Sequence, residues 1–281
     1  MKMKMDHAAS PRPGQSPGCA DRGPPVLELQ DAGFSVDGRT ILLPLRLVVP
    51  AGRMIGVIGH NGSGKSTLGK MLACQIRPTS GQLMVEGRPR ARFSTREFAR
   101  KVAYLPQNIP PAAGMTVKEL IALGRYPWLG AFHAPTAADV RIVDQSMETT
   151  GVSALAQRVV DTLSGGERQR VWLAMLVAQQ ARILILDEPT SALDIKHQME
   201  VLGLLRRLIR THGISVVVIL HDVYMAGRYC DELIALRDGR IAARGACEQI
   251  LTPSALKAIY DIDMDVMVHP ASGDRVVCLS R

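Results

Sequence analysis

The run GHNGSGKST (residues 59–67) combines three glycines with a lysine and three hydroxyl side chains. Its spacing, a glycine, four further residues and then Gly-Lys-Ser, is that of a phosphate-binding loop. Such glycines let successive backbone N–H groups turn toward one anion at the start of a helix. The run follows the β-prone segment RMIGVIG and precedes STLGKMLACQI, whose apolar residues recur at helical spacing. A glycine-rich turn capped by serine would not need the lysine, so the run predicts binding of a nucleoside triphosphate.

Several side chains of this run have roles that their chemistry suggests. Lys65 is expected to reach the β- and γ-phosphates, Ser66 to supply a hydroxyl to magnesium, and Thr67 to bond the α-phosphate. The motif alone does not distinguish a kinase, a GTPase, a helicase or a transporter ATPase. The residues expected to contact the nucleotide are Gly59, His60, Asn61, Gly62, Ser63, Gly64, Lys65, Ser66 and Thr67.

A second element that bears on this chemistry is RILILDE (residues 182–188), an apolar strand that ends in two acids. Phosphoryl transfer needs a further magnesium contact, and Asp187 is the expected ligand. Glu188 directly follows and is placed to polarise an attacking water as a general base. The alternative is an ordinary buried strand with an acidic end. The sequence contains no Asn-Lys-x-Asp motif of the kind that reads guanine, which weakens the GTPase interpretation.

The segment LSGGERQ (residues 163–169) leads into a helix-like run and provides a second helix start with paired glycines. A helix start of this kind favours an anion. The simpler interpretation is a capping box, with Ser164 as N-cap and Glu167 three residues later. A capping box does not explain the second glycine pair, so both interpretations stay open.

Together these motifs resemble those of ABC ATPases. Their order is GHNGSGKST, YLPQN, LSGGERQ, ILILDEPTSALD and VVVILHD, and the resemblance covers about residues 26–270. It implies an α/β fold: a P-loop NTPase (ABC ATPase) core with a small antiparallel β subdomain and an inserted α-helical subdomain. It also implies that two chains pack head to tail, with each ATP between the phosphate-binding loop of one chain and the LSGGERQ segment of the other.

The resemblance assigns further roles. It implies that Gln107 contacts magnesium or the attacking water and that His221 contacts the γ-phosphate; a surface glutamine and a structural histidine are the alternatives. Glu188 completes this catalytic group. Asp194, in SALD, is expected to cross the dimer interface. The residues expected to act on the partner chain's ATP are Ser164, Gly165, Gly166 and Gln169.

One position departs from the pattern of this family. The family usually has an aromatic residue near the first strand that stacks on adenine, and the matching position in LELQDAGFSVDGR falls near Val36. Phe34, two residues earlier, is expected in the core rather than against the base. The sequence therefore leaves the adenine-stacking residue unassigned.

The predicted elements divide the chain into regions. Short β-strands surround the phosphate-binding loop, helices dominate residues 91–175, and strands alternate with helices from residue 182 onward, which is typical of a largely parallel sheet. Helices are expected in FSTREFARK, TVKELIALG, AADVRIVDQSMETTG and ALAQR. Residues 1–25, rich in Pro, Gly and Ser, are expected to be disordered, and residues 271–281 are expected to form a C-terminal tail.

Composition limits the classes of function. The 281 residues carry a net charge of +8, but aromatic residues are only 4% and the basic residues are dispersed, which argues against a nucleic-acid surface. The five cysteines are scattered, so neither a disulfide framework nor a zinc site is expected and a reducing compartment is the simpler interpretation. No run is long and apolar enough to span a membrane, and the N-terminus lacks the apolar core of a secretory signal.

The wider sequence resembles the ATPase of bacterial iron(III)-hydroxamate siderophore importers, in GRTILLPLRL, ARKVAYLPQNIPPAAGMTVKELIALGRYPWLGAF and LDIKHQMEVL. This resemblance implies a homodimer that works with transmembrane permease subunits at the cytoplasmic face of the inner membrane, and indirectly with a siderophore-binding protein. It makes Tyr126, Pro127 and Trp128 candidate permease contacts, with a packed aromatic loop as an equal alternative. Haem or cobalamin import, and a soluble ABC ATPase acting on nucleic acid, are the alternative functions.

Overall fold

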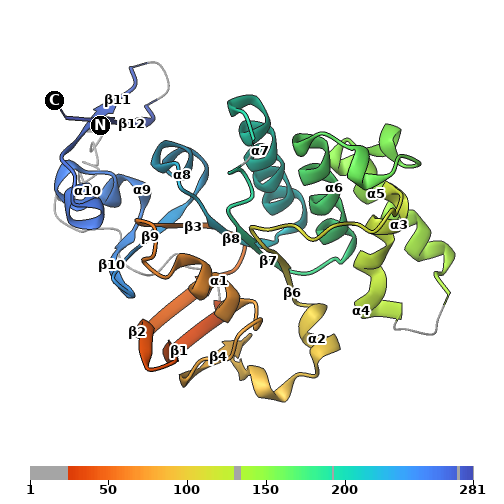
Figure 1. Cartoon of the computed structure of the whole chain (residues 1–281), viewed down its shortest axis with the longest axis horizontal. Coiled ribbons are helices and arrows are strands. Elements are labelled where there is room, and N and C mark those ends of the chain that lie inside the picture. Colours follow the sequence, from red (N-terminus) through yellow and green to blue (C-terminus); the bar gives the residue numbers. More distant parts are fainter. Residues whose placement is uncertain (1–24, 130–133, 192, 271–272, 281) are drawn as a thin grey trace, which may run out of the picture.

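The computed structural model describes residues 25–129, 134–191, 193–270 and 273–280. Its centre is a six-stranded sheet of order β10-β9-β3-β8-β7-β6 (Figure 1), in which all strands except β10 run parallel. The predicted α/β core is therefore confirmed. The strands of this sheet are β3 (Met54–Ile58), β6 (Val102–Leu105), β7 (Ile183–Asp187), β8 (Ser215–Ile219), β9 (Glu232–Arg237) and β10 (Arg240–Gly245).

The central sheet is buried on both faces. In β8, Val216 belongs to one hydrophobic cluster and its neighbour Val217 to the other, because successive side chains point to opposite faces. Helix α1 (Lys65–Leu72) packs on one face and α7 (Ile195–His212) lies on the other (Figure 1). Burial on both faces explains why these strands are continuous apolar runs rather than alternating ones.

A second, antiparallel sheet of order β2-β1-β4-β5 covers the other side of α1 and confirms the predicted β subdomain. Leu42 of this sheet lies against Gly64, where a Cβ would come within 2.6 Å of the Leu42 Cδ2 atom. The sheet therefore fixes the point at which α1 begins. Its strands are β1 (Pro25–Val36), β2 (Arg39–Pro50), β4 (Ser80–Val85) and β5 (Arg88–Pro89).

Helices α3, α5 and α6 pack together at one end of the molecule (Figure 1). Along with α2, each of them begins with a capping box, in which a hydroxyl N-cap and an acid three residues later bond each other's backbone N–H. This reciprocal bonding sets where each helix starts. The helices of this region are α2 (Thr95–Ala99), α3 (Val117–Ala122), α4 (Tyr126–Leu129), α5 (Ala137–Thr150) and α6 (Gly165–Ala178).

The chain after β8 adds three helices and a two-stranded hairpin. These elements are α8 (Val223–Tyr229), α9 (Cys247–Ile250), α10 (Pro253–Tyr260), β11 (Met264–Val268) and β12 (Arg275–Leu279). Short 3₁₀ turns lie at Arg90–Arg92, Leu123–Arg125, Ser153–Leu155 and Val160–Thr162. Within the described residues, no helix combines the length and the apolar character that crossing a membrane requires.

Three segments differ from the sequence-based expectations, and residues 1–24 of the expected tail lie outside the described residues. The region called helical contains β6, which pairs with β7 in the central sheet. Residues 275–279, expected in a tail, form a strand paired with β11. The prediction of a helix in ALAQR was wrong: beyond one 3₁₀ turn, the carbonyls of Ala156 and Arg158 accept bonds from the first N–H groups of α3. That long-range pairing outweighs local helix propensity.

A buried ion pair joins the helices of this end of the molecule. The Arg125 Nε atom donates to Asp139 Oδ1 at 2.9 Å, and the side chains are 6% and 8% exposed. The Arg125 Nη1 atom also donates to the Ala178 carbonyl and to Gln180 Oε1, at the end of α6. Bonds first from Thr136 and then from Arg125 hold the pKa of Asp139 below its usual value.

Replacing Asp139 should destabilise the fold, because Arg125 would keep a buried and unpaired charge. We expect Asp139→Ala to lower the free energy of unfolding by about 3 kcal/mol, measured by chemical denaturation at pH 7. Asp144→Ala, on the same helix, removes the exposed Lys118 pair and should change stability by less than about 1 kcal/mol. Equal effects of the two substitutions would contradict this account.

Candidate nucleotide-binding and hydrolysis site

The glycine-rich loop runs from the end of β3 to the start of α1. Gly64 caps α1 with a φ of 101°, and Gly59 has a φ of 144°. A Cβ on Gly59 would overlap the Leu236 carbonyl oxygen, so both conformation and space require glycine there. The Ser63 hydroxyl is buried and has no hydrogen-bond partner in the described part of the chain. This loop at a helix start has the form that binds anions.

The Lys65 side chain folds back into this loop. Its Nζ atom donates to the carbonyl oxygens of Gly59 at 2.8 Å and His60 at 2.9 Å. Burial lowers the pKa of Lys65, while the nearby Glu188 and Asp187 carboxylates oppose that shift. An ammonium held by neutral carbonyls would gain from an anionic partner, which a phosphate supplies.

The remaining residues of the loop and helix start differ in their exposure to solvent. The His60 Nε2 atom is 3.6 Å from Asp238 Oδ1, at the edge of the loop. Asn61 and Gly62 are exposed, and Thr67 is half-buried in the first turn of α1. All of the predicted phosphate contacts therefore belong to one continuous loop and helix start.

The Asp187 carboxylate lies beside this helix start, at the end of β7. It accepts hydrogen bonds from the Ser66 hydroxyl at 3.1 Å and from the Tyr104 phenol at 3.4 Å. Burial raises the pKa of Asp187, although the Ser66 bond opposes the shift. Burial also raises the pKa of Tyr104, and the neighbouring carboxylate adds to that effect. Sequence reasoning missed Tyr104, because the strand β6 that carries it was itself missed.

The three predicted catalytic residues meet at one carboxylate. The Gln107 Nε2 atom donates to Glu188 Oε2 at 2.5 Å, and His221 Nε2 lies 2.5 Å from Glu188 Oε1. They follow β6, β7 and β8, which are neighbours in the sheet. Glu188 is buried and has a φ of 50°, a conformation that non-glycine residues adopt mainly under structural constraint. Both oxygens of its carboxylate are engaged.

The LSGGERQ segment has the capping geometry that was its simpler interpretation. Glu167 Oε2 accepts from the Ser164 backbone N–H at 2.9 Å, and the Ser164 hydroxyl accepts in return from Glu167. Ser164 and Gly165 are exposed, whereas Gly166 and Gln169 are buried. Of the four residues predicted to contact the partner chain's ATP, Ser164 and Gly165 are therefore the two that are exposed to solvent.

Asp194 caps α7 in its own chain. Its Oδ1 atom accepts from the His197 backbone N–H at 2.9 Å and lies 2.8 Å from His197 Nδ1. The Asp194 side chain is 67% exposed. The contact with His197 was not predicted from the sequence, in which it shows only as an Asp followed three residues later by His.

The first hairpin clarifies the position that departs from the family pattern. Val36 lies at the end of β1 with 47% of its surface exposed. Phe34 is partly buried and packs against the hydrophobic cluster around α1, so its predicted core position is confirmed. The exposed aliphatic side chain, not an aromatic one, stands where the family usually stacks a base.

The YPW segment forms the short helix α4. The Trp128 indole donates to the Gln179 carbonyl at 2.8 Å, and its ring lies 4.9 Å from the Arg100 guanidinium. The Arg100 Nε atom also donates to the Pro127 carbonyl at 2.9 Å. Pro127 is thus buried, whereas Tyr126 and Trp128 keep 59% and 38% of their surfaces exposed.

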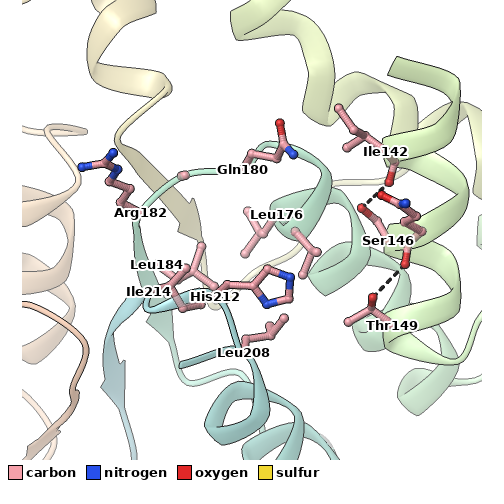
Figure 2. A pocket seen from close by; sticks show the side chains of 13 residues that line it. Ile142, Ser146, Thr149, Leu176, Gln180, Arg182, Leu184, Leu208, His212 and Ile214 are labelled. Atoms are coloured by element: carbon pink, nitrogen blue, oxygen red, sulfur yellow. Dashed lines mark hydrogen bonds between the residues drawn. The ribbon is translucent and has the colours of Figure 1, made fainter. Parts of the chain in front are cut away.

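A separate cavity of about 250 Å³ lies between α5, α6 and α7 (Figure 2). Its walls include Leu176, Leu184, Leu208 and Ile214, and it contains none of the predicted site residues. Leu184 lies near the start of β7, whereas Asp187 lies at its end. This cavity is therefore distinct from the candidate nucleotide site.

Comparison with known proteins identifies the family. Residues 42–191 match the family model described as ABC transporter. The chain belongs to the ABC transporter family. The achromobactin transport ATP-binding protein of Dickeya dadantii is 41% identical over 83% of this chain and 86% of its own length. The iron(3+)-hydroxamate import ATP-binding protein of Bacillus subtilis is 36% identical over 90% and 94%, respectively.

Solved structures agree with this assignment. An ABC transporter of metal-chelate type, solved facing inward, superposes with a TM-score of 0.79 at 25% identity, covering 91% of this chain and 97% of that chain. A dimeric ATP-binding cassette bound to ADP and Pi superposes with a TM-score of 0.68 at 25% identity, over 79% and 98%. The chain is therefore an ABC-type ATPase that binds ATP.

Removing the buried charge of Asp187 should stabilise the folded protein, although Asp187 is the expected magnesium ligand. A carboxyl whose folded pKa is raised stabilises the fold below its unfolded pKa, and this stability is lost as pH rises through the folded pKa. Asp187→Asn should therefore raise the melting temperature of nucleotide-free protein at pH 7, on the order of 2 °C. The gain should shrink on acidification. Asp144→Asn, which loses only an exposed ion pair, should not raise the melting temperature, and a lower melting temperature for Asp187→Asn would refute the prediction.

Proposed function

We propose that this chain is the ATP-hydrolysing subunit of a bacterial ABC importer that powers uptake of a ferric hydroxamate siderophore. The observation that carries the enzymatic part is the meeting of Gln107 and His221 at the Glu188 carboxylate, beside the loop that holds Lys65. The cargo rests on the relatives. The reaction is hydrolysis of ATP by water to ADP and phosphate.

The glycine-rich loop is the proposed triphosphate site. Gly59 through Thr67 would surround the phosphates with backbone N–H groups, and Lys65 would exchange its two carbonyl partners for phosphate oxygens. The unpaired Ser63 hydroxyl supports a ligand in this loop. Val36 offers only a small apolar surface to a base, so we expect phosphate contacts to dominate binding.

The same edge of the sheet fits a magnesium ion. Ser66 and Asp187 present oxygen atoms 3.1 Å apart, and Gln107 adds an amide close by. Hard oxygen donors are the ligands that magnesium prefers. These three residues would hold the ion, which supplies charge neutralisation for the phosphates when bound.

Glu188 is the proposed general base. In the isolated chain its carboxylate accepts a hydrogen bond from Gln107 and lies beside His221 Nε2. Each carboxylate oxygen has a second lone pair, so Glu188 could accept a proton from a water that approaches between these two side chains. With a nucleotide bound, His221 would turn toward the γ-phosphate.

A second copy of the chain would complete the site. Ser164 and Gly165, exposed at the start of α6, would bind the partner's γ-phosphate with Gly166 and Gln169 behind them. Asp194, exposed at the start of α7, would cross the interface. The dimeric cassette among the solved relatives supports this arrangement.

The proposed location follows from the family. The ATPase dimer would lie at the cytoplasmic face of the inner membrane, bound to transmembrane permease subunits and served indirectly by a siderophore-binding protein. Tyr126 and Trp128 are the exposed members of the YPW segment and are the proposed permease contacts, with Pro127 and the bond of the Trp128 indole fixing their position. No nucleic-acid partner is proposed.

The relatives differ in cargo. Those that resemble this chain include proteins for iron(3+)-hydroxamate, achromobactin and ferric enterobactin, and a hemin import ATP-binding protein of Bordetella pertussis that is 39% identical over its whole length. Cobalamin import proteins also match. Siderophores are the commonest cargo among these names, and haem is the specific second candidate.

Glu188→Gln should separate binding from hydrolysis. We expect it to retain ATP binding, to lower turnover by about a hundredfold or more, and to accumulate an ATP-bound dimer. Measurements are phosphate release and size-exclusion chromatography with ATP. Glu200→Gln, an exposed acid on α7, is the matched control. Normal turnover in Glu188→Gln would remove this residue from the base role.

Cellular uptake tests the cargo. A strain complemented with Lys65→Ala should lose uptake of a labelled ferric hydroxamate, while a wild-type complement restores it and other iron routes stay intact. Lys196→Ala, an exposed lysine on α7, should behave as wild type. Unchanged hydroxamate uptake in Lys65→Ala would reject this cargo, and labelled haem would then be assayed in the same strains.

A further inference from the structure

Helix α6, which begins in the LSGGERQ segment, contacts α7 through the Arg170–Glu200 ion pair and through His197, a residue with no role in the proposed site. His197 lies in the first turn of α7, and its imidazole lies across the backbone of Gly166. A Cβ on Gly166 would be 2.9 Å from His197 Cδ2 and 3.2 Å from Cγ. The ring therefore occupies the space that any larger residue at position 166 would need, and the two elements are in direct contact.

The Asp194 carboxylate fixes the orientation of this ring. One oxygen, Oδ1, bonds the His197 backbone N–H and also lies 2.8 Å from His197 Nδ1. Two bonds to a single oxygen hold the main chain and the imidazole together. These bonds lower the pKa of Asp194, so the acceptor stays ionised at neutral pH.

The next residue, Gln198, ties α7 to the turn that carries Glu188. Its Nε2 atom donates to the carbonyls of Leu193 at 3.0 Å and Thr190 at 3.2 Å. The Ser191 hydroxyl donates to the Glu188 carbonyl at 3.2 Å. The described residues on either side of position 192, from Glu188 to Ser191 and from Leu193 to Gln198, are thus linked by hydrogen bonds, and we expect them to move with the start of α7.

We propose that His197 is a positioning residue that couples the two ATP sites of the dimer. The inference rests on the proposed function, in which Gly166 serves the partner's ATP and Glu188 serves the chain's own. Both are attached to the same end of α7, Gly166 through the His197 ring and Glu188 through the bonded turns. When the partner's phosphate binds at the LSGGERQ segment, a shift of this segment's backbone is therefore transmitted through α7 to Glu188, which serves the other ATP site. A change at Glu188 alters phosphate binding at the LSGGERQ segment in return, because coupling between two sites is reciprocal.

The test compares ATP hydrolysis by full-length wild type, His197→Ala and His197→Phe over a range of ATP concentrations. We expect His197→Ala to lower kcat by about fivefold and to bring the Hill coefficient toward one. Binding of a fluorescent ATP analogue to the loop should stay within about twofold. His197→Phe keeps a ring against Gly166 and should retain more than about half of kcat.

His212→Ala is the matched control, because it removes a histidine from the other end of the same helix. If kcat and the Hill coefficient of His197→Ala equal those of this control, the inference is wrong. It is also wrong if His197→Phe loses as much as His197→Ala. If His197→Ala melts well below wild type, His197→Phe decides alone: retained turnover supports the inference and lost turnover overturns it. A wild type that neither dimerises with ATP nor hydrolyses it would instead contradict the proposed function.

Discussion

The parallel register of β6, β7 and β8 is the constraint on which the site depends. Leu186 of β7 pairs with Leu105 of β6 and with Val218 of β8, so the three strands end at nearly the same level. Parallel strands all deliver their carboxyl ends to one edge. Gln107 and His221, which follow two of these strand ends, therefore come within hydrogen-bond distance of Glu188, which follows the third, although the three residues lie far apart in the sequence. Changing the register of one strand would separate the three side chains.

Sequence reasoning succeeded where the physical signal is local. The glycine-rich loop between a strand and a helix, the acid pair at the end of β7 and the capping box at Ser164 all need particular residue types at fixed spacing. It failed where distant backbone decides. The strand β6 has only four residues and is defined by its pairing with β7, and ALAQR is drawn out of helix by the first N–H groups of α3. The His197 ring against Gly166 joins residues too far apart in sequence for any spacing rule.

The segment GRYPW combines residues that pack inside the chain with residues that are exposed on its surface. Arg125 is buried and joins α5 to the end of α6, and Trp128 lies 5.3 Å from the same guanidinium. Tyr126, between them, stays exposed. A sequence comparison cannot separate these roles, because buried and exposed residues occupy adjacent positions in the segment. Only the structure separates the buried Arg125 from Tyr126 and Trp128, whose exposed surfaces another protein could meet.

The Glu188 carboxylate is held in place before any nucleotide arrives. One oxygen accepts a hydrogen bond from Gln107 and the other lies beside His221 Nε2, and both oxygens keep lone pairs to spare. Little side-chain entropy would therefore remain to be lost at this position when a nucleotide binds. More of the binding energy would then be available for drawing two chains together.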